Sequence, residues 1–167
     1  MKKLILLALI AAGAWWHFVG GRKLSEDDVR AFYRDYEIAT LQRKPDALCA
    51  LLADDLQASG SAAIGQRVVQ ESKGKAETCD DWQALFDSWA QLGEKMGGIL
   101  QLDSHYEIHS IEISPDRKTA KVDISSTLDV AGSIMNFSTR STQTLIRKNG
   151  KVLLQHSDSR GSVSAGG

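Results

Sequence analysis

The hydrophobic pattern changes period once along the chain, from a helical spacing in the first half to a strand spacing in the second. From residue 26 to about residue 41, apolar positions recur every three or four residues, which predicts a helix with one buried face. Ser25 precedes it as a typical N-cap. The acidic residues that follow interact favourably with the positive, N-terminal end of the helix dipole. Pro45 begins a second, shorter helix, which we expect to span the sequence PDALCALLADD at residues 45–55.

A third helix is predicted from about Lys75 to the Gly97-Gly98 pair, because glycine commonly follows the last turn of a helix. Its large apolar residues are spaced to share one face: Trp82, Leu85, Phe86, Trp89 and Leu92. The chain between the second and third helices is rich in Gly, Ser and Ala. We expect irregular structure there, with short strands near residues 56–59 and 66–71.

Four segments after the third helix alternate apolar and polar residues: 99–114, 119–132, 133–148 and 151–163. These segments have three junctions, and two of them are turns: Ser-Pro-Asp-Arg-Lys at residues 114–118 and Asn149-Gly150. Consecutive strands joined by short turns predict an antiparallel meander. The whole pattern favours an α+β domain in which three N-terminal helices pack on one face of a strongly curved antiparallel sheet.

The sequence HYEIH at residues 105–109 looks like a metal-binding motif, because its two histidines flank a glutamate. On a strand, however, four residues advance about 13 Å, too far for both histidines to bind one ion at bond lengths near 2 Å. We expect Tyr106 and Ile108 to face the helices, and both histidines and the glutamate to face solvent. The isoleucines at positions 111 and 113 fall in the histidine register, which predicts a bulge near His109–Ser110. We expect neither a metal nor a cofactor.

Residues 4–21 carry no charge, and four basic residues flank them (Lys2, Lys3, Arg22 and Lys23). This pattern is typical of a signal anchor or a signal peptide, here residues 1–23. Cleavage after the small residues at 12–14 would leave a short signal and expose two tryptophans, whereas the uncharged run is as long as the shortest membrane-spanning helices. We favour a single-pass helix in a bacterial inner membrane with the domain in the periplasm. A secreted, soluble periplasmic protein is the alternative.

The remaining residues, 24–167, are acidic. Without the four flanking basic residues the chain has 16 basic against 21 acidic residues, a net charge of −5. A surface of this sign does not attract phosphate backbones, so nucleic acid is excluded as an expected partner.

The two cysteines, Cys49 and Cys79, both lie in the part expected to be exported. In an oxidising compartment a single pair most simply forms one disulfide, which closes a loop of about thirty residues. Two buried free thiols are the alternative.

The sequence DYEIATLQRKPDALCALLADDLQASG resembles the opening of the NTF2-like superfamily, which includes SnoaL-like proteins and ketosteroid isomerases. The sequences SKGKAE and NGKVLLQHSDS resemble later parts of the same superfamily. The resemblance implies a cone-shaped domain over residues 24–163, with a pocket between the helices and the concave sheet, and a disordered tail at 164–167. Because members of this superfamily often pair through their sheets, it also implies a homodimer or an envelope protein as partner.

The resemblance places Tyr36 where the isomerases carry their oxyanion tyrosine, and Gly60 where they carry their catalytic aspartate. Glycine cannot accept a proton, so the isomerase mechanism does not transfer. His156 alternates with two apolar residues, so it could face the pocket together with Asp158 and Arg140. The alternative for each of the three is a structural hydrogen bond or a place on a solvated face.

An apolar cavity would be lined by a set of aromatic residues, although such residues at helical spacing also form ordinary cores. Together with Arg140 and His156, the expected ligand site comprises Tyr33, Tyr36, Trp82, Phe86, Trp89, Tyr106 and Phe137. We therefore expect a non-enzymatic, membrane-tethered module that binds a small hydrophobic ligand or a partner protein. The alternative is an isomerase or dehydratase that uses Tyr36 with His156 or Asp158 as its base.

Overall fold

The computed structural model describes residues 23–64, 67–98, 100–132 and 134–165. The hydrophobic segment expected at residues 4–21 lies outside them. Within the described ranges there are three helices, α2 (Glu26–Leu41), α3 (Pro45–Cys49) and α4 (Lys75–Lys95). None of these helices is long and apolar enough to cross a membrane. The strands are β1 (Leu52–Ile64), β2 (Arg67–Lys73), β3 (Leu102–Ile113), β4 (Thr119–Val130), β5 (Met135–Lys148) and β6 (Lys151–Ala165).

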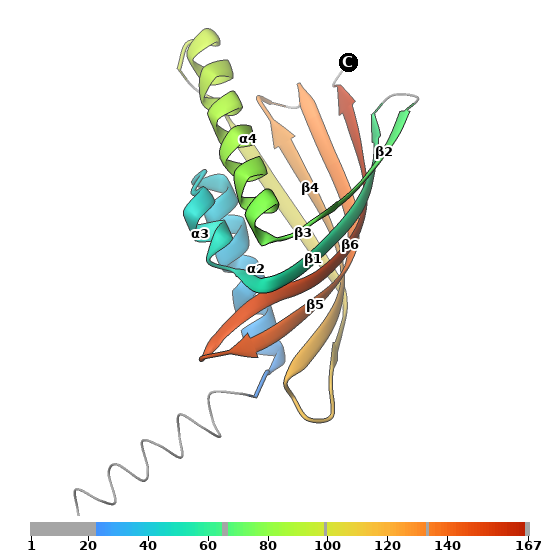
Figure 1. Cartoon of the computed structure of the whole chain (residues 1–167). Coiled ribbons are helices and arrows are strands. Elements are labelled where there is room, and N and C mark those ends of the chain that lie inside the picture. Colours follow the sequence, from blue (N-terminus) through green and yellow to red (C-terminus); the bar gives the residue numbers. More distant parts are fainter. Residues whose placement is uncertain (1–22, 65–66, 99, 133, 166–167) are drawn as a thin grey trace, which may run out of the picture.

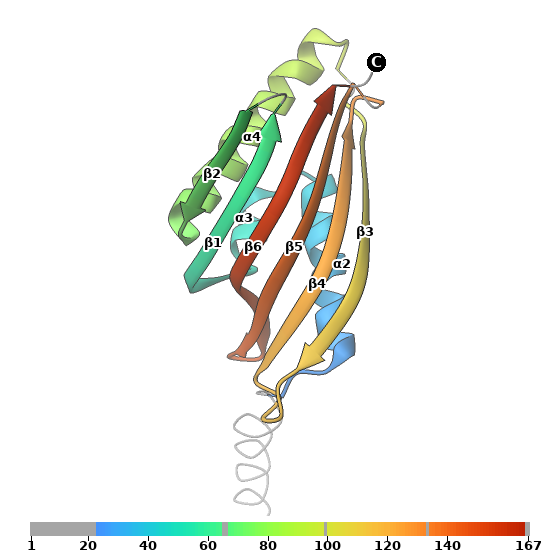
Figure 2. The same ribbon diagram turned by 90° about the vertical axis from the view of Figure 1, so that its right-hand side faces the viewer.

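The strands form one sheet in the order β2-β1-β6-β5-β4-β3 (Figure 2). All three helices lie on one side of this sheet, which curves around them (Figure 1). The predicted α+β architecture with a four-strand meander is therefore confirmed. The prediction of a wholly antiparallel sheet is wrong for one pair, because β1 and β6 run parallel. Helix α4 and four strands separate these two strands along the chain, which is ample length for a parallel connection.

The ends of the long helices follow their predicted signals. Ser25 and Asp28 form a capping box, in which the Ser25 backbone N–H donates to Asp28 Oδ2 at 3.0 Å and the Asp28 N–H donates to Ser25 Oγ at 3.3 Å. Helix α4 begins at Lys75, and beyond its end Gly97 and Gly98 have φ values of 92° and 97°. Only glycine adopts such values without steric cost, which explains why the helix stops there.

The second helix is shorter than predicted, and the chain that follows it is a strand. Helix α3 ends at Cys49, and the LADD sequence opens β1 instead of closing the helix. Leu52 pairs with Leu154 of β6, and the Leu154 N–H donates to the Leu51 carbonyl at 2.8 Å. Pairing with a distant strand thus overrides the local helical pattern. The hairpin of β1 and β2 is also longer than the short strands expected near 56–59 and 66–71.

The HYEIH segment lies on β3 with the orientation predicted for it. Ile108 pairs with Ile124 and Ser110 pairs with Asp123, so His109 is the extra residue of a bulge. Both histidines and the glutamate between them are exposed, whereas Tyr106 and Ile108 pack against the core. The predicted bulge and the outward direction of the polar residues are confirmed.

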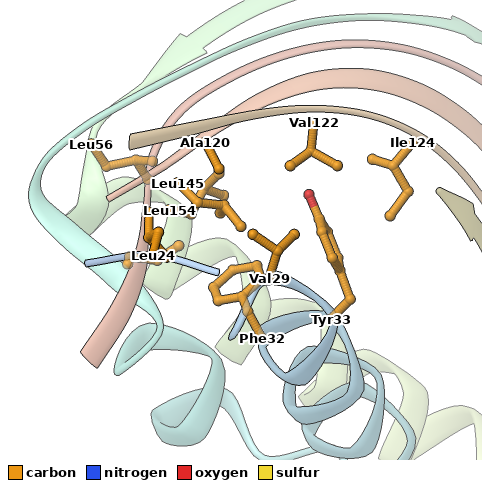
Figure 3. Close-up of a cluster of buried hydrophobic side chains, with 11 residues drawn as sticks. Leu24, Val29, Phe32, Tyr33, Leu56, Ala120, Val122, Ile124, Leu145 and Leu154 are labelled. Atoms are coloured by element: carbon orange, nitrogen blue, oxygen red, sulfur yellow. The ribbon is translucent and has the colours of Figure 1, made fainter. Parts of the chain in front are cut away.

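A packed cluster fills the space between α2 and one end of the sheet, and we call it the packed end (Figure 3). Its members are buried side chains from the N-terminal segment, α2 and the strands: Leu24, Val29, Phe32, Tyr33, Leu52, Leu56, Ala120, Val122, Ile124, Leu145 and Leu154. The chain enters α2 here, where the Leu24 N–H donates to the Arg117 carbonyl at 2.6 Å. At the other end of the chain, β6 continues to Ala165, two residues beyond the expected domain boundary at 163.

Candidate functional site

A pocket of about 340 Å³ lies between the helices and the concave face of the sheet, next to the packed end. One of its walls is aromatic. The helices contribute five aromatic side chains and the strands contribute two more: Tyr33, Tyr36, Trp82, Phe86, Trp89, Tyr106 and Phe137. Several of these rings touch, with Tyr36 and Trp82 edge to face at 5.9 Å between ring centroids and Phe86 and Trp89 at 5.4 Å.

The sheet side of the pocket is a row of hydroxyl groups, which we call the hydroxyl wall: Ser104, Ser126, Thr139, Ser141, Ser157 and Ser159. These residues face inward because they occupy matching positions on neighbouring strands, as in the pairs Ser126 with Thr139 and Ser141 with Ser159. Ser141 is only 6% exposed, and its hydroxyl has no hydrogen-bond partner among the described residues. Arg43 Nε is the one fully buried side-chain polar atom without a partner among the described residues, so the Ser141 hydroxyl is still accessible from the pocket. A water or a ligand in the pocket can therefore supply its hydrogen bond.

Two tyrosines on α2 provide the phenol groups of the pocket. The Tyr33 hydroxyl donates to Gln143 Oε1 at 2.9 Å, and Figure 3 shows its oxygen pointing from α2 toward the sheet. The Tyr36 hydroxyl has no partner in the described part of the chain. Burial raises the pKa of Tyr36 to about 12 and also raises the pKa of Tyr33. Both phenols therefore stay protonated at neutral pH and serve as hydrogen-bond donors.

Glu37 is the only charged residue among the described residues that line this pocket. It follows Tyr36 on α2 and is half-buried. The sequence offered no signal for it, because a glutamate on an amphipathic helix normally belongs to the solvated face. The pocket as a whole is therefore lined by aromatic, aliphatic and hydroxyl-bearing side chains with one carboxylate.

Solved structures with the same arrangement of helices and strands identify the fold. A protein from Novosphingobium aromaticivorans that is provisionally named a scytalone dehydratase matches with a TM-score of 0.60 at 13% identity, over 85% of this chain and 87% of its own. A ketosteroid isomerase-like protein from Erwinia carotovora matches with a TM-score of 0.52 at 16% identity, over 81% and 94% of the two chains. An NTF2-like protein of unknown function from Shewanella oneidensis matches with a TM-score of 0.56 at 14% identity, over 82% and 99%. The chain has the NTF2-like fold.

No family model and no curated protein matches the sequence of this chain. The likeness to the three structures, at 13%, 16% and 14% identity, establishes the NTF2-like fold and nothing further. Any activity must therefore be argued from the residues of this chain's own pocket.

The two bases predicted for this NTF2-like pocket point out of it. In β6, Leu154 pairs with Leu145 and His156 pairs with Thr144, so Gln155 is the extra residue of a bulge. The bulge reverses the inward and outward alternation, which leaves His156 and Asp158 exposed and outside the pocket lining. The prediction that His156 and Asp158 face the pocket is wrong for this reason.

Arg140 also lies outside the pocket, so its predicted place in the ligand site is wrong. It pairs with Ser125 in the sheet and is exposed, and its Nη2 contacts Asp123 Oδ2 at 2.9 Å. The hydrogen bonds from Arg140 hold the pKa of the Asp123 carboxyl below its usual range. Both side chains belong to the polar outer face of the sheet.

The predicted disulfide is present and supports the aromatic wall. Cys49 at the end of α3 is bonded to Cys79 in the first turns of α4, with 5.6 Å between their Cα atoms. Trp82 follows Cys79 by one helical turn, so the bond holds that tryptophan's part of α4 beside α3. The disulfide is therefore part of the scaffold that positions the pocket.

Proposed function

We propose that this chain is a non-catalytic binding protein for a small, uncharged and mostly apolar molecule, which it holds in the NTF2-like pocket. The observation that carries the proposal is the lining itself, in which seven aromatic side chains face a row of hydroxyls. A few placed polar groups in a mainly apolar cavity are typical of small-molecule sites.

The volume of the pocket limits the size of the ligand. A cavity of about 150 Å³ in another protein takes up benzene. A pocket of about 340 Å³ has roughly twice that volume and suits a compound of two fused rings. Tyr36 and Ser141 supply unpartnered hydroxyls, which favour a ligand that carries a hydroxyl or a carbonyl group.

Acid–base catalysis has weaker support than binding. The alternative enzyme needs His156 or Asp158 as a base opposite Tyr36, and both side chains are exposed on the other face of the sheet. Gly60, at the position of the isomerase aspartate, has no side chain to offer. The names of the dehydratase and the isomerase-like protein describe those proteins, whose likeness to this chain is one of fold.

Binding of 2-naphthol to the full-length protein in lipid nanodiscs tests the proposal, measured by isothermal titration calorimetry with empty nanodiscs as the blank. We expect saturable binding at one site. Ser141→Leu fills the pocket from the sheet and should weaken binding about tenfold or more, which is about 1.4 kcal/mol. Ser138→Leu is the matched control, because Ser138 lies on the same strand and is exposed on its outer face. Equal affinities of the two variants, or no binding by the unmodified chain, would contradict the proposal.

We also propose that residues 4–21 tether the domain to the outer face of the inner membrane. The support is the uncharged run with basic residues on both sides. Deletion of residues 1–23 should move the protein from the membrane fraction to the soluble fraction. A full-length protein that is already soluble would contradict the tether.

A further inference from the structure

A second cavity of about 450 Å³ adjoins the pocket, and we call it the groove. The two cavities share five lining residues: Ala58, Thr78, Trp82, Thr139 and Ser159. The remaining groove residues come from the β1–β2 hairpin, from β6 and from the first turns of α4. The pocket and the groove are therefore neighbouring parts of one continuous hollow, and Trp82 stands at their junction.

The floor of the groove is open because its strands carry small residues there. Gly60, Ala62 and Gly161 line it. A Cβ at Gly60 would lie 3.7 Å from the Ser159 Cβ, and a Cβ at Gly161 would lie 3.2 Å from Thr139 Oγ1, so both glycines face the same side as these inward residues. Any larger side chain at position 60 would occupy the hollow. The position that the family resemblance gives to a catalytic carboxylate is thus part of a binding floor in this chain.

One edge of the groove carries charge, in contrast to the pocket. The charged residues among its described lining are Glu71, Lys73 and Asp81. Lys73 Nζ lies 2.7 Å from Asp81 Oδ2 across the space between β2 and α4, and it also contacts Glu71. The Glu71 and Asp81 side chains remain 54% and 55% exposed. Two carboxylates around one ammonium leave a net charge of −1 and oxygen atoms free to accept further hydrogen bonds.

We propose that the pocket and the groove together hold one elongated ligand, with an apolar ring body among the aromatic residues, a chain along the groove floor, and an ammonium group at Glu71 and Asp81. The proposal rests on the proposed function, since it requires the ring body to bind in the pocket. In the pocket, the Ser141 hydroxyl has no hydrogen-bond partner among the described residues and is available to a polar group of the ligand. The ligand class is therefore an apolar amine with a ring at one end.

The sign of the terminal charge follows from the groove edge. A ligand ammonium only donates hydrogen bonds, and the two exposed carboxylates can accept charge-assisted ones from it. A ligand carboxylate would have to displace Glu71 or Asp81 from Lys73 against their repulsion.

The experiment compares three probes that share a naphthyl ring and a four-carbon chain and end in an amine, an alcohol or a carboxylate. Each is titrated calorimetrically into the full-length protein in nanodiscs, with empty nanodiscs as the blank and 2-naphthol as the chainless reference. We expect the amine to bind about fivefold more tightly than the alcohol, and the carboxylate to bind more weakly than both.

Three variants locate the two ends of the ligand. Gly60→Val should remove the gain in affinity that the chain gives over 2-naphthol, because it fills the groove and leaves the pocket unchanged. Asp81→Asn should abolish the preference for the amine over the alcohol, whereas Asp80→Asn is the matched control on the same helix outside both cavities. Glu71→Gln provides a second test of the charged edge should Asp81→Asn fail to fold, which circular dichroism would reveal.

The outcomes separate this inference from the proposed function. If neither 2-naphthol nor any chain-bearing probe binds, the proposed function fails, and the inference that rests on it fails too. If 2-naphthol binds but the chain adds no affinity, or the carboxylate binds best, the inference alone is overturned. An amine preference that survives both Asp81→Asn and Glu71→Gln would likewise overturn it.

Discussion

The two ends of the concave face are built from the same strands but from different sizes of side chain. At the packed end, the inward positions of β4, β5 and β6 hold Ala120, Val122, Leu145 and Leu154, which are buried against α2. Further along the same strands the inward positions become the hydroxyl wall and then Gly161. In this middle stretch the inward side chains are too small to fill the space up to the helices, whereas beyond it Leu128, Val130 and Phe137 pack with α4.

This difference decides whether the NTF2-like cone has a core or a hollow. Interiors pack to a nearly constant density, so large inward residues leave no space for a ligand. Serine, threonine and glycine in the middle of the strands leave a pocket of about 340 Å³ below the helices. Beyond this stretch, Phe86 and Trp89 of α4 pack again on apolar residues of the sheet, including Val130 and Phe137. The function proposed above therefore depends on a gradient of residue size along the strands, which no single residue defines.

The largest expected contrast between the two ends is in the cost of removing a side chain. Leu145 at the packed end is 0% exposed, and Leu145→Ala should lower the free energy of unfolding by about 3 to 5 kcal/mol through lost burial and a residual cavity. Ser141→Ala, on the same strand, should change it by less than about 1 kcal/mol because the hydroxyl has no partner to lose. Chemical denaturation followed by circular dichroism measures both, and similar losses would show that the pocket end is packed as tightly as the core.

A somewhat smaller effect is expected at the helical wall of the pocket. Replacement of both Cys49 and Cys79 by serine opens a loop with a sequence separation of 30 residues, and should cost about 3 kcal/mol of unfolding free energy. Because the bond holds α4 beside α3, we also expect the double variant to bind 2-naphthol more weakly, while Leu145→Ala should leave that affinity largely intact. If the double variant were less stable but bound 2-naphthol with unchanged affinity, the disulfide would stabilise the fold without positioning the pocket.

The sequence predicted the aromatic wall because it depends on a local periodicity. Trp82, Phe86 and Trp89 fall on one face of a helix at any register, so their spacing alone brings them together. The bulge at His109 was equally visible, because the apolar residues of β3 change parity on either side of it.

The bulge at Gln155 left no such trace in the sequence. The inward residues beyond it are serines, which look the same as outward serines, so His156 appeared to continue the alternation of Leu154. The same absence of large residues hid the hydroxyl wall and the groove floor. The small inward residues that leave room for the pocket do not show in a hydrophobic pattern. They become visible only once the pairing register of the strands is known.

Enlarging a side chain should also distinguish the two ends, because it should lower stability at the packed end and leave it unchanged at the pocket. Ala120 is 0% exposed at the packed end, and Ala120→Val should cost about 1 to 3 kcal/mol because the surrounding side chains have no room to move. Ser141→Val adds similar bulk where the hollow can receive it, and should leave stability unchanged or slightly higher. Thermal unfolding of the two variants checks this prediction, and a cost at Ser141 as large as that at Ala120 would contradict the size gradient.

The smallest expected effect is a dependence on pH. Stability should depend on pH through Asp28 at the packed end, whereas affinity in the pocket should not change at neutral pH. Burial opposes the charge on Asp28, but hydrogen bonds from Ser25 and Arg147 outweigh it and hold the pKa of this carboxyl below its ordinary value of 3.8. A lowered folded-state pKa stabilises the fold above the unfolded value near 3.8, and that contribution is lost as pH falls through the folded value.

Asp28→Asn should therefore cost about 1 kcal/mol at pH 7, where it breaks the capping box and the 2.7 Å contact with Arg147 Nη1, and the difference from the unmodified chain should shrink below pH 4. Asp27→Asn is the control in the same helical turn, because it removes the same charge from an exposed side chain outside the capping box. Affinity for 2-naphthol should stay constant over neutral and mildly alkaline pH, since Tyr36 keeps its proton up to a pKa of about 12. Chemical denaturation across pH measures the effect at Asp28, and calorimetric titration with 2-naphthol across pH measures the effect in the pocket. A stability difference that persists unchanged below pH 3 would show that Asp28 acts through packing and the cap geometry, independently of its charge.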